Sequence, residues 1–147
     1  MWYRLTHPPI PAQIRAEAKA LSVDPRKLYD ARILDQKLFE KKLTPSEWQR
    51  YISYANTCSA LRNMVARHLS AAQGTPYEAQ ARRLLAQFLK DSDPSARAGA
   101  LIALRNFHDP SWQSVARQDL SDPSPQVRSL ASGLLQMEAL RKAGEKP

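Results

Sequence analysis

The chain has 147 residues, of which 43% are hydrophobic and 24% charged, and this ordinary composition excludes global disorder. No apolar run approaches the roughly 20 residues that cross a bilayer, and the first residues do not resemble a signal peptide. A single cysteine, Cys58, excludes an internal disulfide and a cysteine-based zinc site. We therefore expect one cytoplasmic domain without membrane insertion.

The net charge of +8 is concentrated in the first half of the chain. Residues 1–72 carry a net +6 and residues 73–147 only +2, and no acidic residue occurs between Trp48 and Tyr77. A positive field of this kind favours an anionic partner such as nucleic acid, although a basic protein also gains solubility from it. The candidate anion-binding residues are Arg26, Lys27, Arg50, Arg62, Arg67, Arg82 and Arg83.

Six pairs of a capping residue and a following proline each predict the start of a helix. Asp, Ser or Thr at the N-cap accepts a hydrogen bond from the first turn, and proline at the next position loses none. Two pairs continue as capping boxes, Thr44 with Glu47 and Thr75 with Glu78. No stretch alternates as a strand would. The predicted helices cover residues 11–21, 25–43, 45–73 (with a break near 56–57), 76–90, 94–107, 110–120 and 124–141.

The second half of the chain repeats at a spacing of 31 residues. Among the identical residues that this shift superimposes are Asp91 and Asp122, Pro94 and Pro125, and Arg97 and Arg128. The second helix of each unit carries a stripe of small and apolar residues that we expect to be buried. The two stripes are Ala96, Ala100, Ala103, Leu104 and Phe107, and Val127, Ala131, Leu134 and Leu135.

These units resemble HEAT repeats, including the short PBS-lyase HEAT-like form, which has an aspartate at the turn, then a proline, and an arginine six residues after the aspartate. The resemblance covers residues 76–141, whereas segment 44–74 keeps the period but has Ala60 and Ala66 in place of Asp and Arg. It implies an all-α fold, an α-α superhelix that is a short solenoid of antiparallel helix pairs with extra N-terminal helices. The single domain then comprises N-terminal helices (1–43), a degenerate pair (44–74), two repeats (75–108 and 109–141) and a tail (142–147).

The recurring Asp91, Arg97, Asp122 and Arg128 are interpreted as a structural ladder and not as catalytic groups. An aspartate in the turn and an arginine in the next helix can bond within and between repeats. The three histidines have no metal-ligand spacing, and the sequence contains neither a nucleophile–base pair nor a phosphate-binding loop. We therefore expect no catalytic site, no metal and no cofactor.

The resemblance implies a scaffold but no particular activity, because a fold does not determine a function. The leading hypothesis is a non-enzymatic adaptor that binds a protein partner on the concave face of the second helices. The candidate residues of this face are Ala98, Ile102, Arg105, Ser129, Gly133 and Gln136. One alternative is a nucleic-acid-binding module that uses the basic N-terminal half, and a more distant one is a HEAT-like lyase or another enzyme. The oligomeric state stays open, as does the question whether the N-terminal helices fold back over Ile102.

Overall fold

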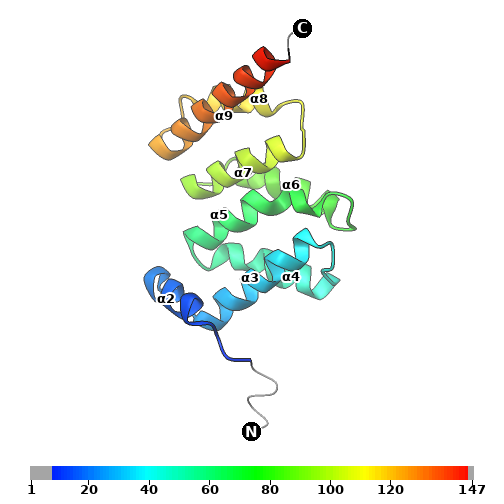
Figure 1. Cartoon of the computed structure of the whole chain (residues 1–147), viewed down its shortest axis with the longest axis vertical. Helices are drawn as coiled ribbons and strands as arrows, with labels where there is room; N and C mark the ends of the chain where they lie inside the picture. Colours follow the sequence, from blue (N-terminus) through cyan, green and yellow to red (C-terminus); the bar gives the residue numbers. More distant parts are fainter. Residues whose placement is uncertain (1–7, 146–147) are drawn as a thin grey trace.

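The computed structural model describes residues 8–145, and the regular structure in this range consists of helices (Figure 1). The all-helical prediction is therefore confirmed for these residues. Residues 1–7, where the signal-peptide expectation falls, and residues 146–147 of the predicted tail lie outside the described part. No helix within 8–145 is long and apolar enough to cross a membrane. The elements are α2 (Ala12–Leu21), α3 (Pro25–Phe39), α4 (Pro45–Ser53), η1 (Tyr54–Asn56), α5 (Ser59–His68), η2 (Leu69–Ala72), α6 (Glu78–Phe88), α7 (Pro94–Asn106), α8 (Trp112–Asp119) and α9 (Pro125–Gly144).

Four helices, α3, α4, α7 and α9, begin at a predicted proline. The capping box at Thr44 is confirmed, because Glu47 N donates to Thr44 Oγ1 at 3.3 Å and Thr44 N donates to Glu47 Oε1 at 3.0 Å. Lys37 Nζ donates to the same carboxylate at 2.6 Å. Hydrogen bonds from Lys37 and from the Thr44 backbone lower the pKa of Glu47 to about 2. This charged network ties the start of α4 to α3.

The capping box predicted at Thr75 is wrong. Thr75 Oγ1 donates to Ala72 O at 2.6 Å, and Glu78 accepts from Gly74 N at 2.9 Å instead of from Thr75 N. Gly74 has a φ of 80°, a left-handed conformation that side chains disfavour, so the chain turns here before α6 begins. Helix α6 therefore starts two residues later than predicted, at Glu78.

The ends of several helices differ from the predicted ones, because the chain bends at positions that the hydrophobic periodicity does not mark. The predicted helix 45–73 is divided among α4, η1, α5 and η2, and the expected break lies at Cys58, whose backbone is extended. Helix α3 ends at Phe39, since Lys41 has a φ of 60°. Helix α8 begins at Trp112 instead of 110, and α9 continues to Gly144, so residues 142–144 of the predicted tail are helical.

The helices pack in two layers. Helices α3, α5, α7 and α9 contact one another in this order along the length of the molecule, and we call them the row helices (Figure 1). Helices α4, α6 and α8 form the second layer and pack against the row helices. The N-terminal helix α2 packs on α3, and α3 packs on α4, α5 and η2. The described N-terminal helices therefore extend the row and do not lie over α7.

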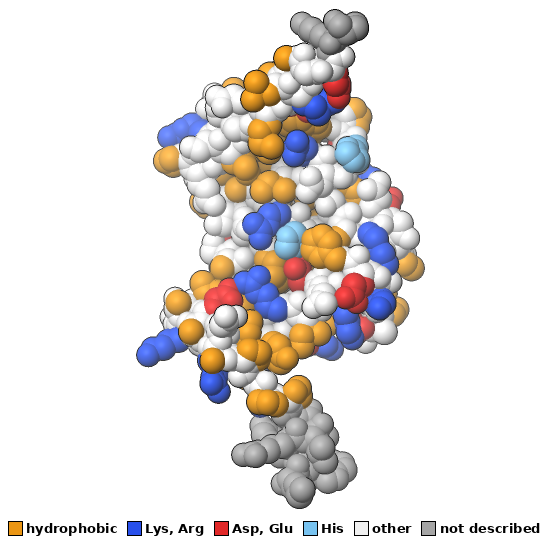
Figure 2. All heavy atoms as spheres, in the orientation of Figure 1, with side chains coloured by type: hydrophobic (Ala, Val, Ile, Leu, Met, Phe, Trp, Pro, Cys, Tyr) orange, Lys and Arg blue, Asp and Glu red, His pale blue; other side chains and the backbone are white. Residues whose placement is uncertain are grey.

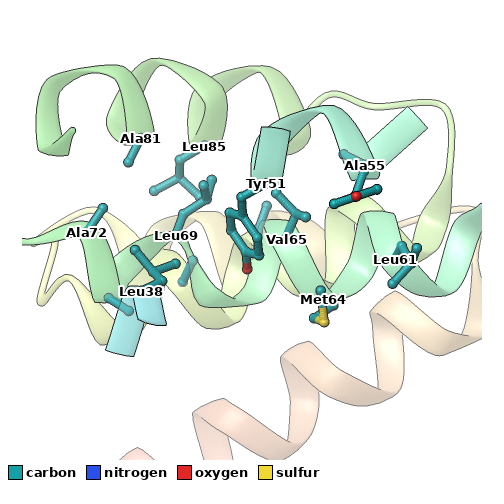
Figure 3. Packing of buried hydrophobic residues seen from close by; sticks show 14 of the residues in the cluster. Leu38, Tyr51, Ala55, Leu61, Met64, Val65, Leu69, Ala72, Ala81 and Leu85 are labelled. Carbon is teal, nitrogen blue, oxygen red and sulfur yellow. The ribbon is translucent and has the colours of Figure 1, made fainter. Parts of the chain in front are cut away.

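One hydrophobic core runs through the molecule from α2 to α9. In its central part, Tyr51, Val65 and Leu85 point toward one another from α4, α5 and α6 (Figure 3). The predicted stripe of α7 is buried throughout. In α9 the stripe is buried except for Leu135, which is only half-buried. The predicted burial of these two stripes is thus confirmed except at Leu135.

The row helices α5 and α7 approach each other closely at Gly99 of α7. A Cβ atom at this position would meet the carbonyl oxygen of Asn63 at 2.7 Å and the Cβ atom of Ala66 at 3.2 Å. Asn63 Nδ2 also donates to Ser95 O at 2.8 Å across the same contact. The absence of a side chain at Gly99 therefore lets α5 and α7 pack almost backbone to backbone.

Candidate functional site

The predicted ladder residues lie at the junction between the two predicted repeats. Arg97 Nε and Nη2 donate to the two carboxylate oxygens of Asp122 at 3.0 and 2.9 Å, and Arg97 Nη1 donates to Asp91 O at 2.8 Å. The Asp122 side chain is only 7% exposed. Its hydrogen bonds with Arg97 lower the pKa of Asp122 below its ordinary value and raise that of Arg97. The contact spans α7 and the turn before α9.

Arg128 repeats the part of this pattern that lies within one unit. Its Nη1 donates to Asp122 O at 2.7 Å, six residues back, as Arg97 does to Asp91. The carboxylate of Asp91 accepts from Asp93 N at 2.8 Å and lies 3.7 Å from Arg62. These four residues therefore bond to the backbone and to one another, and their functional groups serve helix packing.

The candidate anion-binding residues do not form one group of free charges. Three of them form ion pairs with carboxylates of the protein itself, at 2.7 to 3.7 Å: Arg50, Arg62 and Arg82. Three are exposed and have no ion pair with a described residue: Arg26, Lys27 and Arg83. They lie on different elements, the first two on α3 and the third on α6. Arg67, the seventh, lies on a row helix and is described separately below.

The candidate concave face is only partly available to a partner. Ala98 is 3% exposed, so its predicted place on an open face is wrong, because α5 approaches α7 closely at the adjacent Gly99. Ile102 and Arg105 on α7 are half-buried, as is Gly133 on α9. The remaining two residues are exposed on α9, Ser129 and Gln136.

Exposed apolar side chains concentrate on the row helices. Five large apolar residues of the described chain are exposed, and four of them lie on α3 and α9: Ile33, Phe39, Met137 and Leu140. Met137 and Leu140 follow Gly133 by four and seven residues, so they share its side of α9. Figure 2 shows hydrophobic groups beside lysine or arginine groups over the row helices. Sequence analysis missed these residues, although the i, i+4, i+7 spacing from Gly133 was visible.

A hydrogen-bonded cluster joins α3, α4 and α5 next to Phe39. Tyr51 Oη donates to Asp35 Oδ1 at 2.6 Å, and His68 Nδ1 lies 2.8 Å from the same oxygen. Burial of the phenol, with the Asp35 charge as a further cause, raises the pKa of Tyr51 well above its usual value, so Tyr51 keeps its proton. The ring of Phe39 meets that of His68 edge-on at 4.9 Å. The cluster fixes an exposed aromatic ring beside a histidine.

Arg67 is the exception among the polar side chains of this face. It has no hydrogen bond or ion pair with any described residue, and its Nε is buried without a partner. Its backbone nitrogen would lie 3.1 Å from a Cβ at Gly99, so the residue sits at the close contact between α5 and α7. Buried polar groups are nearly always paired, so an unpaired guanidinium nitrogen calls for an explanation.

None of three comparisons, with protein-family models, with curated proteins and with solved structures, found a match to this chain. Its function has to be argued from its own residues and contacts. Within residues 8–145, no group of three or more His, Cys, Asp or Glu side chains is placed to hold a metal ion.

A polar cavity of about 550 Å³ lies between α7, α8 and α9. Arg105 lies over the ring of Trp112 at 5.6 Å, and Arg141 donates to Glu138 at 2.5 and 3.0 Å. The lining of the cavity therefore includes charged groups of both signs, Arg105 and Arg141 on one side of the balance and Glu138 on the other. The cavity is continuous with the side of the row helices that carries Arg105.

Proposed function

We propose that the chain is a HEAT-like helical scaffold, a short α-α superhelix, that binds a protein segment across the row helices and catalyses no reaction. Support for the fold comes from the 31-residue period and from the Arg97–Asp122 contact between successive units. Support for the function comes mainly from one observation, that four of the five large apolar side chains exposed within residues 8–145 lie on row helices.

Exposed apolar side chains that gather on one part of a molecule are expensive to leave in water, and they mark places where another molecule binds. Phe39 is 55% exposed and Leu140 is 74% exposed, at the two ends of the row. The half-buried Ile102 lies on α7 between them. An amphipathic helix or extended peptide that crosses the row would cover all three side chains.

A nucleic-acid partner is the weaker alternative. A polyanion requires cations that are free to neutralise phosphates, and three of the seven candidates are already paired with carboxylates. The exposed candidates without an ion pair are dispersed over α3 and α6, whereas a phosphate chain needs several free cations along one path.

The variant Ile102→Glu is expected to remain folded and to lose partner binding. Ile102 is half-buried on α7, so the carboxylate of a glutamate at this position can reach water. The melting temperature should therefore fall by only a few degrees. The probe for binding is a synthetic 16-residue peptide with leucines at i, i+3, i+4 and i+7 and glutamine elsewhere, measured by fluorescence anisotropy. Its affinity should decrease because a charge replaces an apolar contact.

Ala98→Glu is the matched control for stability, because Ala98 is buried only four residues away on the same helix. Its carboxylate has no access to water and should unfold much of the protein. Equal losses of melting temperature in the two variants would contradict an open face at Ile102. Binding of duplex DNA with a steep log-linear salt dependence, in place of peptide binding, would favour the nucleic-acid alternative.

A further inference from the structure

We infer, resting on the proposed function, that the bound segment is acidic and that one of its carboxylates pairs with Arg67 while an adjacent apolar side chain packs on Phe39. The inference names the chemistry of the partner, a peptide segment that alternates acidic and apolar residues. It follows from the state of Arg67, from the balance of charges on the row helices and from the space beside Arg67.

The guanidinium of Arg67 has unused hydrogen-bonding capacity. An arginine carries five N–H donors, and none of them meets an acceptor among the described residues. By contrast, Arg62 and Arg97 use their Nε atoms to bind Ala55 O and the Asp122 carboxylate. A carboxylate is the protein group whose two oxygens match the guanidinium fork. Arg67 is therefore prepared to bind one.

The charged side chains of the row helices leave a positive surplus. The carboxylates of the row helices are engaged within the protein: Asp30 pairs with Arg50, Asp35 binds Tyr51 and His68, and Glu138 pairs with Arg141. Two guanidinium groups on α5 and α7 have no carboxylate partner among the described residues, those of Arg67 and Arg105. A partner is selected by complementary charge, so this surplus favours an acidic segment over a basic one.

The neighbours of Arg67 leave room for a segment to lie across the row. The 31-residue shift that relates the repeats places Arg67 in register with Ala98 and Ser129, both of which are small. On the other side, Phe39 is exposed against the ring of His68. A segment crossing at this level meets an apolar ring and a free cation side by side. Its acidic residue can then pair with Arg67 while its apolar residue packs on Phe39.

The test compares three labelled 16-residue peptides with the same leucine positions and with Glu, Gln or Lys at the positions between them. Fluorescence anisotropy at about 0.15 M salt should give the order of affinity Glu, then Gln, then Lys. Arg67→Gln should lower the affinity for the Glu peptide about tenfold, to the affinity of the Gln peptide, because the substitution removes a charge-assisted hydrogen bond. The affinity for the Gln peptide should not change.

Arg83→Gln is the control, because this substitution removes the same charge from a residue that is exposed on α6, outside the row. Melting curves of both variants verify that they are folded. Equal affinities for the Glu and Gln peptides, or equal effects of the two variants, would overturn the role of Arg67 while leaving the binding function intact. Failure of all three peptides to bind would overturn both proposals, as would DNA binding that Arg67→Gln abolishes.

Discussion

Replacing Gly99 with alanine is expected to destabilise the protein, although alanine favours a helix over glycine by about 1 kcal/mol. The added methyl group would lie 2.7 Å from the carbonyl oxygen of Asn63, and it would also crowd Ala66 and the backbone of Arg67. A backbone carbonyl within a helix cannot turn away, so α5 and α7 must separate. Overpacking of this kind costs about 1–3 kcal/mol, which outweighs the gain in helix propensity.

Gly133→Ala provides the matched control for this substitution. Gly133 also lies inside a row helix, α9, but a Cβ atom there meets nothing within 4 Å. This variant should therefore raise the free energy of unfolding by up to about 1 kcal/mol. Urea unfolding of both variants measures the difference directly. Stabilisation by both alanines would show that α5 and α7 do not approach as closely as described.

Replacing Arg97 with alanine is expected to cost about 3–5 kcal/mol of unfolding free energy. Arg97 supplies two of the three hydrogen bonds to the Asp122 carboxylate, the third coming from Ser124 N, and the Asp122 side chain is 7% exposed. Without Arg97 a negative charge stays in the interior with too little water to solvate it, and Asp91 O also loses a donor. Chemical unfolding at neutral pH measures the loss.

The pH dependence of this effect has a definite sign. Because Arg97 lowers the pKa of Asp122 in the folded protein, the pair contributes stability above the ordinary aspartate pKa of 3.8. This contribution is lost as the pH falls through the lower pKa of the folded state, so wild type and Arg97→Ala should converge in acid. The control is Arg50→Ala, whose more exposed pair with Asp30 should contribute less than about 1 kcal/mol. An equal loss in both variants would contradict the ladder.

The local features of this fold could be predicted from the sequence because they depend on neighbouring residues. A capping residue followed by proline marks the starts of α3, α4, α7 and α9, and in the first three the cap hydrogen bond forms because both of its partners lie within one turn. The buried stripe of α7 follows from a periodicity of 3.6 residues. Thr75 shows the limit of such reasoning, because Gly74 and the end of η2 take over the groups that the cap would have used.

The candidate site depends on contacts between residues far apart in the chain, which no local pattern reveals. His68 lies within hydrogen-bonding distance of Asp35, which is 33 residues away in the chain. The positive charge of the first half looked like a continuous field, but Arg50 and Arg62 have carboxylate partners 20 and 29 residues away. Gly99, an isolated glycine inside a helix, was the one available signal of a close helix contact.

The most direct test of the central claim, that the row helices bind a protein segment, is to map the bound glutamine peptide by NMR. Backbone amide shifts of the full chain would be followed as this leucine-containing peptide is added. The account predicts that the largest changes fall on α3, α5, α7 and α9, near Phe39, Ile102 and Leu140. Changes confined to α4, α6 and α8, or no changes at saturating peptide, would contradict it.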